Sequence, residues 1–406
     1  MKGKLFFILT LVLGGVILFG GLTWLNMQLI ENIDTGEHFL VSWTRARAFL
    51  LEGKNPYGEV VTQDVQVQVY GRYAQGDEYT YQMGMPFYKL FVYFPFALIN
   101  DYELSFAIWL VFAEIALLGV GLLSVHLSGW KPSVLHNALF NLSVLFSFLG
   151  VFSIVGGSGA VFIALSLLIA LILFRDEDDG LLGLLLLAGT FNPAQGGAFF
   201  VLLILSLLYK QRWQAFRVAL MGVITLFIVS SLILPDWLSS YYEVLVAGLV
   251  GYGVTLSDFL MLWIPEYSNI IADLVRWLVV AVLIIEWATN LRRGFSHLLW
   301  VAALVIISVP FLNISFSPYF LTLFFFPLPL VFKNIQERWP KASNWLIILF
   351  LLLLLSTQII VQADQNTMQI LIFAYSLVVL VGLYWVRWWS LRLPHTWVDD
   401  INRHRY

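Results

Sequence analysis

The amino-acid sequence predicts an all-α polytopic integral membrane protein, and its composition decides this. The 406 residues are 60% hydrophobic and only 12% charged, and the mean hydropathy is +0.85. Such a chain is too apolar for a soluble globular domain or a disordered chain. Its apolar residues form continuous runs, whereas a membrane β-barrel shows short alternating segments. We therefore expect transmembrane helices arranged as a bundle.

The positive charges predict how the bundle crosses the membrane. Lysine and arginine concentrate in cytoplasmic loops, and most of the 22 basic residues fall on one side if both termini are cytoplasmic. The first apolar run, 5–25, is too long for a cleaved signal peptide and no small-x-small cleavage site follows it, so we expect an uncleaved anchor. The expected bundle has about 12 transmembrane helices. Most are long enough to cross a bilayer, and the others are shorter segments interrupted by unwound backbone at membrane depth. The spans are 6–27, 103–126, 137–154, 159–174, 180–191, 197–209, 216–234, 268–290, 297–315, 318–332, 343–361 and 368–386.

We divide the chain into four parts, of which the second, a large first outer loop, is the most informative. The stretch 86–99 inside this loop is short, aromatic and interrupted by Pro86 and Pro95, which suits a re-entrant or interfacial element. If it crossed the membrane, the orientation of every later span would reverse. The parts are 1–30, an N-terminal membrane anchor helix; 31–102, the outer loop with an interfacial helix and the re-entrant segment; 103–386, the multi-span membrane domain; and 387–406, a cytoplasmic tail.

Two spans are expected to be broken by unwound backbone, at 156–159 (Gly-Gly-Ser-Gly) and at 192–197 (Asn-Pro-Ala-Gln-Gly-Gly). Unwound backbone at membrane depth is tolerated where it is buried in protein or lines a wet cavity. In the expected topology both breaks lie on the outer side, together with 31–85 and a second outer segment at 235–268. All the unusual backbone therefore converges on one face.

The outer loop carries the residues best suited to chemistry. Asp34 and Glu37 follow the first span and precede an expected helix at 39–52, which Gly53 ends. Partial desolvation near the headgroups can raise the pKa of such a carboxylate toward that of a general base. Acids at this position are also commonly no more than solvated, so both interpretations stay open.

Cationic and aromatic side chains accompany these acids. Arg45 and Arg47 are either surface residues or contacts for an anionic group, and arginine is well suited to phosphate. Lys89 either pairs with a lipid phosphate or extends to the membrane surface. The tyrosines around Arg72 and before Lys89 suit sugar rings, although such aromatic residues are equally normal at membrane interfaces.

Other classes of site find little support. The chain has no cysteine, and we find no metal-ligand spacing, phosphate-binding loop or nucleophile elbow; we expect neither a metal nor a cofactor. The net charge of −3 argues against a nucleic-acid partner. Within the spans, Asp273 and Arg276 are expected to pair along one helix face, Glu286 is expected to be structural, and Glu114 stays open.

The loop resembles glycosyltransferase family 87, a family of polytopic α-mannosyltransferase-like enzymes. The similarity rests on 43–57, where an alanine-containing helix runs into Gly53-Lys54-Asn55-Pro56-Tyr57, and it extends from Glu59 through Tyr70-Gly71-Arg72 to Pro86-Phe87-Tyr88 and Pro95. It continues weakly over 150–235 and Pro235-Asp236-Trp237, so that about half the chain is covered.

The resemblance implies a C-type glycosyltransferase fold that uses a polyprenyl-phosphate sugar and needs no nucleotide site. An acidic residue of the first outer loop would deprotonate the acceptor, and cations would stabilise the departing phosphate. Three family motifs differ here. His38-Phe39 stands for an Asp-Phe pair, Gly157-Ser158 for Gly-Gln, and Asn192-Pro193 for Lys-Pro. Either neighbours such as Glu37, Arg45 and Lys89 have taken over these roles, or the chain is inactive.

The leading hypothesis is a hexosyltransferase of the cell (plasma) membrane that transfers a mannose-like hexose from a polyprenyl-phosphate donor to a glycolipid or glycan acceptor on the extracytoplasmic face. Its partners would be these substrates and membrane lipids; the oligomeric state stays open. The alternatives are a lipid-linked sugar carrier, against which the apolar cytoplasmic halves of the spans and the lack of an internal repeat argue, and a catalytically inactive relative. The candidate catalytic residues are Asp34 and Glu37, and the candidate substrate contacts are His38, Arg45, Arg47, Tyr57, Arg72, Tyr88, Lys89, Asn192 and Gln195.

Overall fold

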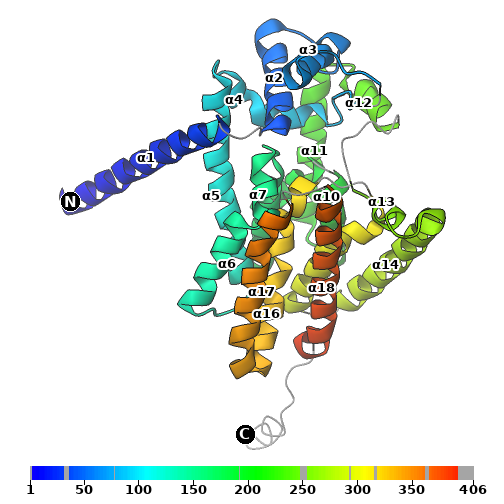
Figure 1. The fold of residues 1–406 in the computed structure, drawn as a ribbon. Coiled ribbons are helices and arrows are strands. Elements are labelled where there is room, and N and C mark those ends of the chain that lie inside the picture. Colours follow the sequence, from blue (N-terminus) through cyan, green and yellow to red (C-terminus); the bar gives the residue numbers. More distant parts are fainter. Residues whose placement is uncertain are drawn as a thin grey trace, which may run out of the picture. The chain divides into compact units, whose positions relative to one another are not determined.

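The computed structural model describes residues 2–31, 36–76, 78–191, 193–246, 254–291, 294–314, 318–361 and 365–391, with only the backbone for a few helical residues (Figure 1). Regular structure within these ranges consists of α-helices and 3-10 helices. The chain is thus an all-α protein, as the sequence predicts. The first part contains α1 (Lys2–Ile30), α2 (Glu37–Glu52), α3 (Glu59–Tyr70), the 3-10 helix η1 (Phe87–Tyr93), α4 (Phe94–Ala97) and α5 (Tyr102–Ser128).

The remaining helices follow one another with short connections. They are α6 (Val134–Phe146), α7 (Phe148–Val155), α8 (Ala160–Asp176), α9 (Asp179–Leu186), η2 (Leu187–Thr190), α10 (Pro193–Tyr209), α11 (Trp213–Ile233), α12 (Trp237–Val246), α13 (Leu256–Met261), η3 (Pro265–Tyr267), α14 (Ser268–Asn290), α15 (Phe295–Ser308), η4 (Val309–Leu312), η5 (Pro318–Phe325), α16 (Pro327–Arg338), α17 (Pro340–Val361) and α18 (Gln365–Leu391).

Seven helices in the described ranges are long and apolar enough to cross a membrane, or eight if α6 and α7, which meet at a 41° bend, count as one span. This establishes a polytopic, membrane-embedded protein. Two further apolar helices, Asp179–Thr190 and Gly196–Tyr209, are shorter, and the expected span 318–332 is divided between η5 and α16. The seven are Val12–Ile30, Tyr102–Ser128, Trp213–Ile233, Pro265–Thr289, Phe295–Leu312, Pro340–Gln358 and Asn366–Trp385.

Helices η1 and α4 occupy the stretch 86–99, and neither belongs to a candidate span. Seven residues of 3-10 helix followed by four of α-helix reach only about 20 Å, less than the roughly 30 Å of a hydrocarbon core. Pro95 lies in the first turn of the short α4, where its missing N–H group is harmless. The segment instead packs on α2.

The chain forms two compact units, and each unit combines segments that are distant from one another in the sequence. The first unit joins Met1–Ala116 with two distant pieces, Phe152–Phe162 and Ile224–Gly251. The second contains Leu117–Val151, Ile163–Val223 and Tyr252–Tyr406. The outer loop is therefore completed by the α7–α8 junction and by α12, which lie far away in the sequence.

Helix α2 is the centre of the first unit. Its buried face repeats at helical spacing, with Phe39, Trp43 and Ala46 nearly or fully excluded from solvent. The Phe39 ring stacks on Phe106 with a centroid distance of 5.2 Å and lies 5.3 Å from Trp109. Such aromatic pairs contribute about 0.5–1.5 kcal/mol each beyond the area that they bury. Helices α3, α4 and η1 pack around α2 (Figure 1).

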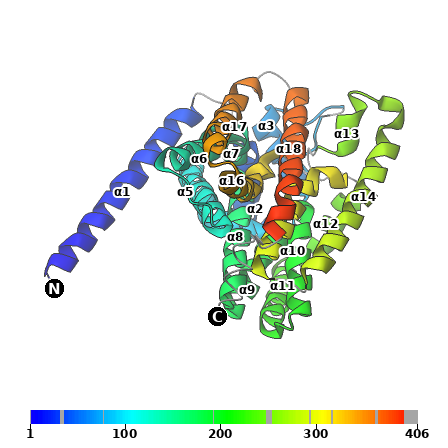
Figure 2. The same ribbon diagram turned by 90° about the horizontal axis from the view of Figure 1, so that it is seen from below.

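The second unit is a helical bundle around α15, whose residues from Leu298 to Ser308 are all buried. Helix α15 packs against α14, α16 and α18, and α17 packs against α6 (Figure 2). Glycine allows one close approach, since a Cβ at Gly183 would lie 2.6 Å from Val218. Small residues at such contacts are the usual means of bringing membrane helices together.

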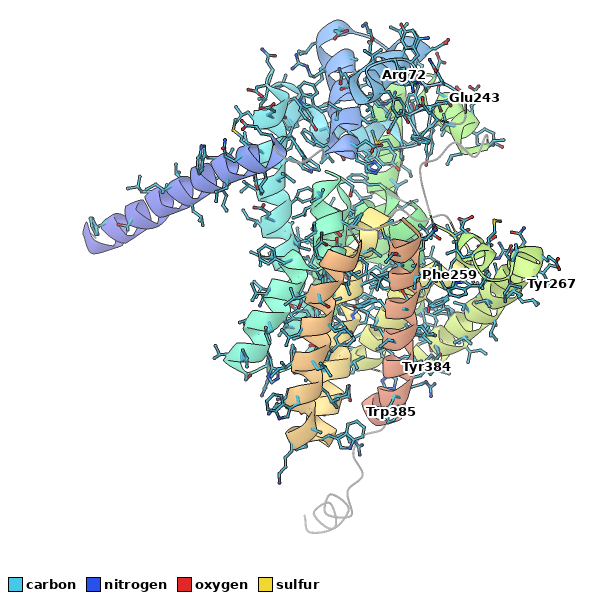
Figure 3. The ribbon with its side chains drawn as sticks, viewed as in Figure 1. Arg72, Glu243, Phe259, Tyr267, Tyr384 and Trp385 are labelled. Carbon is cyan, nitrogen blue, oxygen red and sulfur yellow. The ribbon has the colours of Figure 1, made fainter. Side chains whose placement is uncertain are left out.

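Ion pairs hold the ends of these helices. Asp273 and Arg276 pair at 3.1 Å along α14, as predicted from their spacing. Glu286 pairs with Arg387 at 2.8 Å, which gives it the structural role expected. The sequence places Arg387 in the tail, but α18 continues through it to Leu391, and the rest of the predicted tail lies outside the described residues. Next to this pair, the ring of Tyr384 lies 5.6 Å from that of Trp300 (Figure 3).

Candidate functional site

The beginning of α2 lies against the break between α7 and α8. The Gly36 N–H donates to the carbonyl of Val155 at 2.9 Å, and the His38 N–H donates to that of Gly156 at 3.0 Å. Two of the amides that a helix N-terminus leaves without intrahelical partners are thereby satisfied. The outer loop and the first glycine-rich break therefore come together, as the sequence predicts. The second break begins in the other unit, at a position outside the described residues.

Glycine is required on both sides of this contact. Gly157 has φ +70°, and a Cβ there would lie 2.5 Å from the Cβ of Phe39. Gly36 has φ +87°, and a Cβ there would lie 2.5 Å from the ring of Phe106. Residues with side chains rarely adopt this left-handed backbone. The two glycines thus allow Glu37 and His38 to sit directly beside the broken span.

Glu37 occupies the first turn of α2, where the helix dipole favours a negative charge. Its carboxylate accepts a hydrogen bond from the Tyr81 hydroxyl. Tyr81 is buried and has φ +53°, an unusual backbone conformation for a tyrosine. Burial, followed by this hydrogen bond to Glu37, raises the pKa of Tyr81. The carboxylate is therefore oriented by a fixed neutral donor while remaining partly accessible.

Arg45 is not placed as the substrate contact that the sequence predicts. The side chain is fully buried, and its guanidinium donates to the carbonyls of Pro56 and Tyr81 and to Thr62 Oγ1 at 3.3 Å. Burial lowers its pKa to about 10, which still leaves it charged at neutral pH. Because Arg45 joins α2 to two loop segments, we do not retain it as a ligand contact.

Arg47 and Arg72 are also engaged by the protein itself. Arg47 donates to the carbonyl oxygens of Ala97 at 3.0 Å and Ile99 at 3.3 Å, and its guanidinium stacks 4.8 Å from the Trp43 ring centroid. Arg72 forms a two-pronged ion pair with Glu78 at 2.6 and 2.7 Å. These contacts fix the α4 connection and the loop after α3, so neither arginine is retained as a substrate contact.

Lys89 is different from these arginines. It lies on η1, outside the candidate spans, and is partly accessible. Within the described ranges no carboxylate forms an ion pair with its ammonium group, and burial lowers its pKa to about 8. A largely desolvated cation without a protein counterion is costly unless an anionic ligand supplies one.

His38 lies close enough to Lys89 for the two to interact electrostatically. Burial, with a further contribution from the Lys89 charge, lowers the pKa of His38 to about 4. The imidazole is consequently neutral at physiological pH and leaves Lys89 as the cation of this pair. The first turn of α2 thus offers a carboxylate at Glu37 and a neutral imidazole beside a cation.

Aromatic side chains pack around Tyr88, which directly precedes Lys89 in η1. Tyr57 donates its hydroxyl to the Met85 carbonyl at 2.8 Å. The Tyr88 ring, next to Lys89 in η1, lies 6.0 Å from Trp237 of α12. Sequence reasoning named Tyr57 and Tyr88 but missed Trp237 and Tyr241 as site residues. The proline-aspartate-tryptophan sequence before α12 was the one available signal.

Three of the predicted site residues lack a described side chain. Asp34 and Asn192 lie outside the described residues, and Gln195 is placed only as part of the α10 backbone. The first turn of α2 follows Asp34 closely in the sequence. Their predicted roles stay predictions.

The first turn of α2 carries a carboxylate, and next to it an imidazole within electrostatic range of a cation. These groups suit acid–base chemistry on an anionic, hydroxyl-bearing substrate. No group of three or more metal-binding side chains occurs among the residues that the structure describes. Comparison of the chain with protein-family models, with curated proteins and with solved structures finds no match.

Proposed function

We propose that this protein is a membrane hexosyltransferase that takes a mannose-like hexose from a polyprenyl-phosphate donor and transfers it to a glycolipid or glycan acceptor. The observation that carries the proposal is the first turn of α2, where Tyr81 holds the partly accessible Glu37 carboxylate and His38 lies within electrostatic range of Lys89. A polytopic membrane setting gives a polyprenyl lipid access from the bilayer, and a partly accessible loop gives access to a polar acceptor.

Glu37 is the proposed general base. It would remove the proton of the acceptor hydroxyl while the oxygen attacks the anomeric carbon and the bond from that carbon to the phosphate oxygen breaks. Tyr81 holds the carboxylate in place, and such orientation contributes substantially to the rate. Asp34 remains the alternative base, because it precedes the same helix.

Lys89 is the proposed contact for the donor phosphate. As the glycosidic bond breaks, negative charge grows on the leaving phosphate, and a positioned ammonium group stabilises that charge most where water is excluded. The neutral His38 beside it is placed to hydrogen-bond a phosphate or sugar oxygen. No arginine is needed for this role.

The finer parts of the sequence interpretation belong to the same proposal. They are membership of glycosyltransferase family 87, a C-type glycosyltransferase bundle of about 12 spans, location in the cell membrane with both termini cytoplasmic, and a site on the extracytoplasmic face. The segment 86–99 belongs to no candidate span. This supports the topology, because the later spans then keep the orientation that the positive charges predict.

Sugar transfer in isolated membranes tests the proposal. Membranes carrying the full chain receive a panel of radiolabelled polyprenyl-phosphate hexoses, and labelled product is measured for the wild type, Glu37→Gln, Asp34→Asn and the double variant. Glu59→Gln is the matched control, since Glu59 also opens a helix after a glycine but is exposed. We expect transfer by the wild type and the control and a loss of at least a hundredfold in Glu37→Gln.

The other outcomes are equally informative. Transfer abolished only by Asp34→Asn would assign the general base to Asp34 and leave the proposed reaction intact. Full transfer by the double variant would overturn the assignment of both acids. No transfer from any donor would reject the enzyme and favour the sugar carrier or an inactive relative.

A further inference from the structure

The aromatic cluster of the first unit contains phenylalanines, tryptophans and tyrosines. Its largest fully buried members carry no hydroxyl group, and several of its partly accessible members are tyrosines. The buried members include Phe39, Phe87, Phe106 and Trp109, and the partly accessible tyrosines include Tyr57, Tyr88 and Tyr241.

Trp237 packs against two of these tyrosines. It is only 3% exposed, and its indole N–H donates to Ser231 Oγ at 3.1 Å. The Tyr88 ring meets it edge-on at 6.0 Å, and the Tyr241 ring is stacked nearly parallel to it at 6.4 Å. Both geometries are favourable for aromatic pairs. Tyr88 and Tyr241 are therefore held at defined angles by one buried indole.

The three tyrosines come from three separate elements. Tyr57 precedes α3, Tyr88 belongs to η1, and Tyr241 belongs to α12, whose outer side also carries the exposed Glu243 (Figure 3). Burial, followed by the proximity of Tyr241, raises the pKa of Tyr57, and Tyr88 contributes as well. The three phenols thus lie within electrostatic range of one another.

The hydroxyl of Tyr241 is open to a ligand. Within the described part of the chain it has no hydrogen-bond partner, and the side chain is partly accessible. A pyranose ring offers C–H groups on its faces and hydroxyls at its edges, and binding sites for such molecules combine aromatic surfaces with a few placed polar groups. Phenols supply both requirements in one side chain.

We propose that Tyr57, Tyr88 and Tyr241, backed by Trp237, bind a hexose ring of the acceptor glycan. The assignment rests on the proposed function, because it places the acceptor sugar beside Lys89, which follows Tyr88 directly on η1. A membrane-interface belt also contains tyrosine, but it does not require phenols from three elements to lie within electrostatic range of one another, with two of the rings packed on one buried indole.

Binding of soluble sugars, measured apart from transfer, tests this site. The purified full chain in lipid nanodiscs is titrated with the methyl α-glycosides of mannose, glucose and galactose, and saturation-transfer NMR detects contact. We expect at least one glycoside to bind, with the strongest transfer at ring C–H protons. Tyr241→Ala should weaken binding at least fivefold, whereas the matched control Tyr242→Ala, which alters the 64%-exposed neighbour, should bind as the wild type does.

A second variant covers the case in which Tyr241→Ala does not fold. Tyr88→Phe/Tyr241→Phe keeps both rings and removes both hydroxyls, and it should also bind at least fivefold more weakly. Absence of contact with all three glycosides, or binding equal to wild type in both variants, would overturn the site.

The experiments can reject the sugar site and the proposed transfer reaction independently of each other. Glycoside binding that depends on Tyr241, combined with no transfer from any polyprenyl-phosphate hexose, would retain the sugar site and reject the reaction. Transfer with an unchanged acceptor KM in Tyr241→Ala would retain the reaction and reject the site.

Discussion

The Tyr81 hydroxyl donates a hydrogen bond to the Glu37 carboxylate, while the Tyr81 carbonyl accepts one from Arg45. One residue thereby connects a buried arginine to the proposed general base. The positive φ of Tyr81 is unfavourable for a tyrosine, and the Arg45 contact stabilises it. The rings of Tyr70 and Tyr79 pack at 5.4 and 4.9 Å from that of Tyr81 and limit its movement.

Removal of this hydrogen bond should slow transfer without weakening donor binding. Tyr81→Phe keeps the ring and its packing but leaves Glu37 free to rotate, so we expect kcat to fall about tenfold with little change in the donor KM. Initial rates over a range of donor concentrations give both constants. Tyr73→Phe, at an exposed position, is the control. A rise in the donor KM at constant kcat would contradict a positioning role.

Arg45 should matter for stability rather than for ligand binding. Arg45→Met removes the donors of the Pro56 and Tyr81 carbonyls and of Thr62, and leaves buried acceptors unpaired. We expect the free energy of unfolding to fall by about 3–5 kcal/mol, measured by chemical unfolding in detergent. Arg72→Met, which breaks an exposed ion pair with Glu78 and an exposed hydrogen bond to the Tyr73 carbonyl, should change it little. Stability equal to wild type would show that the loops hold together without Arg45.

The difference between Gly53 and Arg45 shows what the sequence can and cannot predict. The end of α2 at Gly53 was predicted correctly, because a left-handed C-cap is a local requirement of the backbone. The structural role of Arg45 was not predicted, because its burial depends on Pro56 and Tyr81, which reach it only after the loop has folded.

The same reason applies to the candidate site, whose residues remain predictions. Glu37 and Lys89 were proposed because partial desolvation near the headgroups can make an acid a general base, and because a lysine close to an apolar run can pair with a lipid phosphate. Trp237 and Tyr241 were missed because they reach the site from a segment nearly 150 residues further along the chain. Tyrosine and tryptophan near a membrane span carry no local sign that separates a binding site from an interface belt.

His38 should make stability depend on pH below neutrality. Its pKa is about 4 in the folded protein against about 6.5 in an unfolded chain, so the unfolded state binds more protons between these values. The contribution of His38 to the free energy of unfolding is therefore fully present above about pH 6.5. It falls by at most about 3 kcal/mol as the pH drops to 4. Thermal unfolding from pH 4 to 7 should show a shallower dependence for His38→Gln, while the exposed control His126→Gln keeps the full slope. An unaltered slope in His38→Gln would mean that another group carries the dependence.

Lys89 should make binding of polyprenyl phosphate depend on pH above neutrality. Its pKa is about 8 in the free protein, so the ammonium group that would pair with the phosphate is lost as the pH rises through this value. Above pH 7 the phosphate is largely in its doubly charged form, so the change in Kd reports Lys89. Because the anion binds the protonated lysine, Kd should rise by about tenfold per unit well above pH 8. Binding of polyprenyl phosphate to the full chain in nanodiscs is measured from pH 6 to 10.

Two substitutions separate charge from structure at this position. Lys89→Arg keeps the cation over the whole range, so its Kd should stay nearly level up to pH 10. Lys89→Gln should bind at least tenfold more weakly at pH 7 and show no rise in Kd with pH, and Lys131→Gln, at an exposed position, should behave as the wild type. If Lys89→Gln and the wild type bind with the same pH profile, the phosphate is held elsewhere, and the lack of a counterion for Lys89 among the described residues needs another explanation.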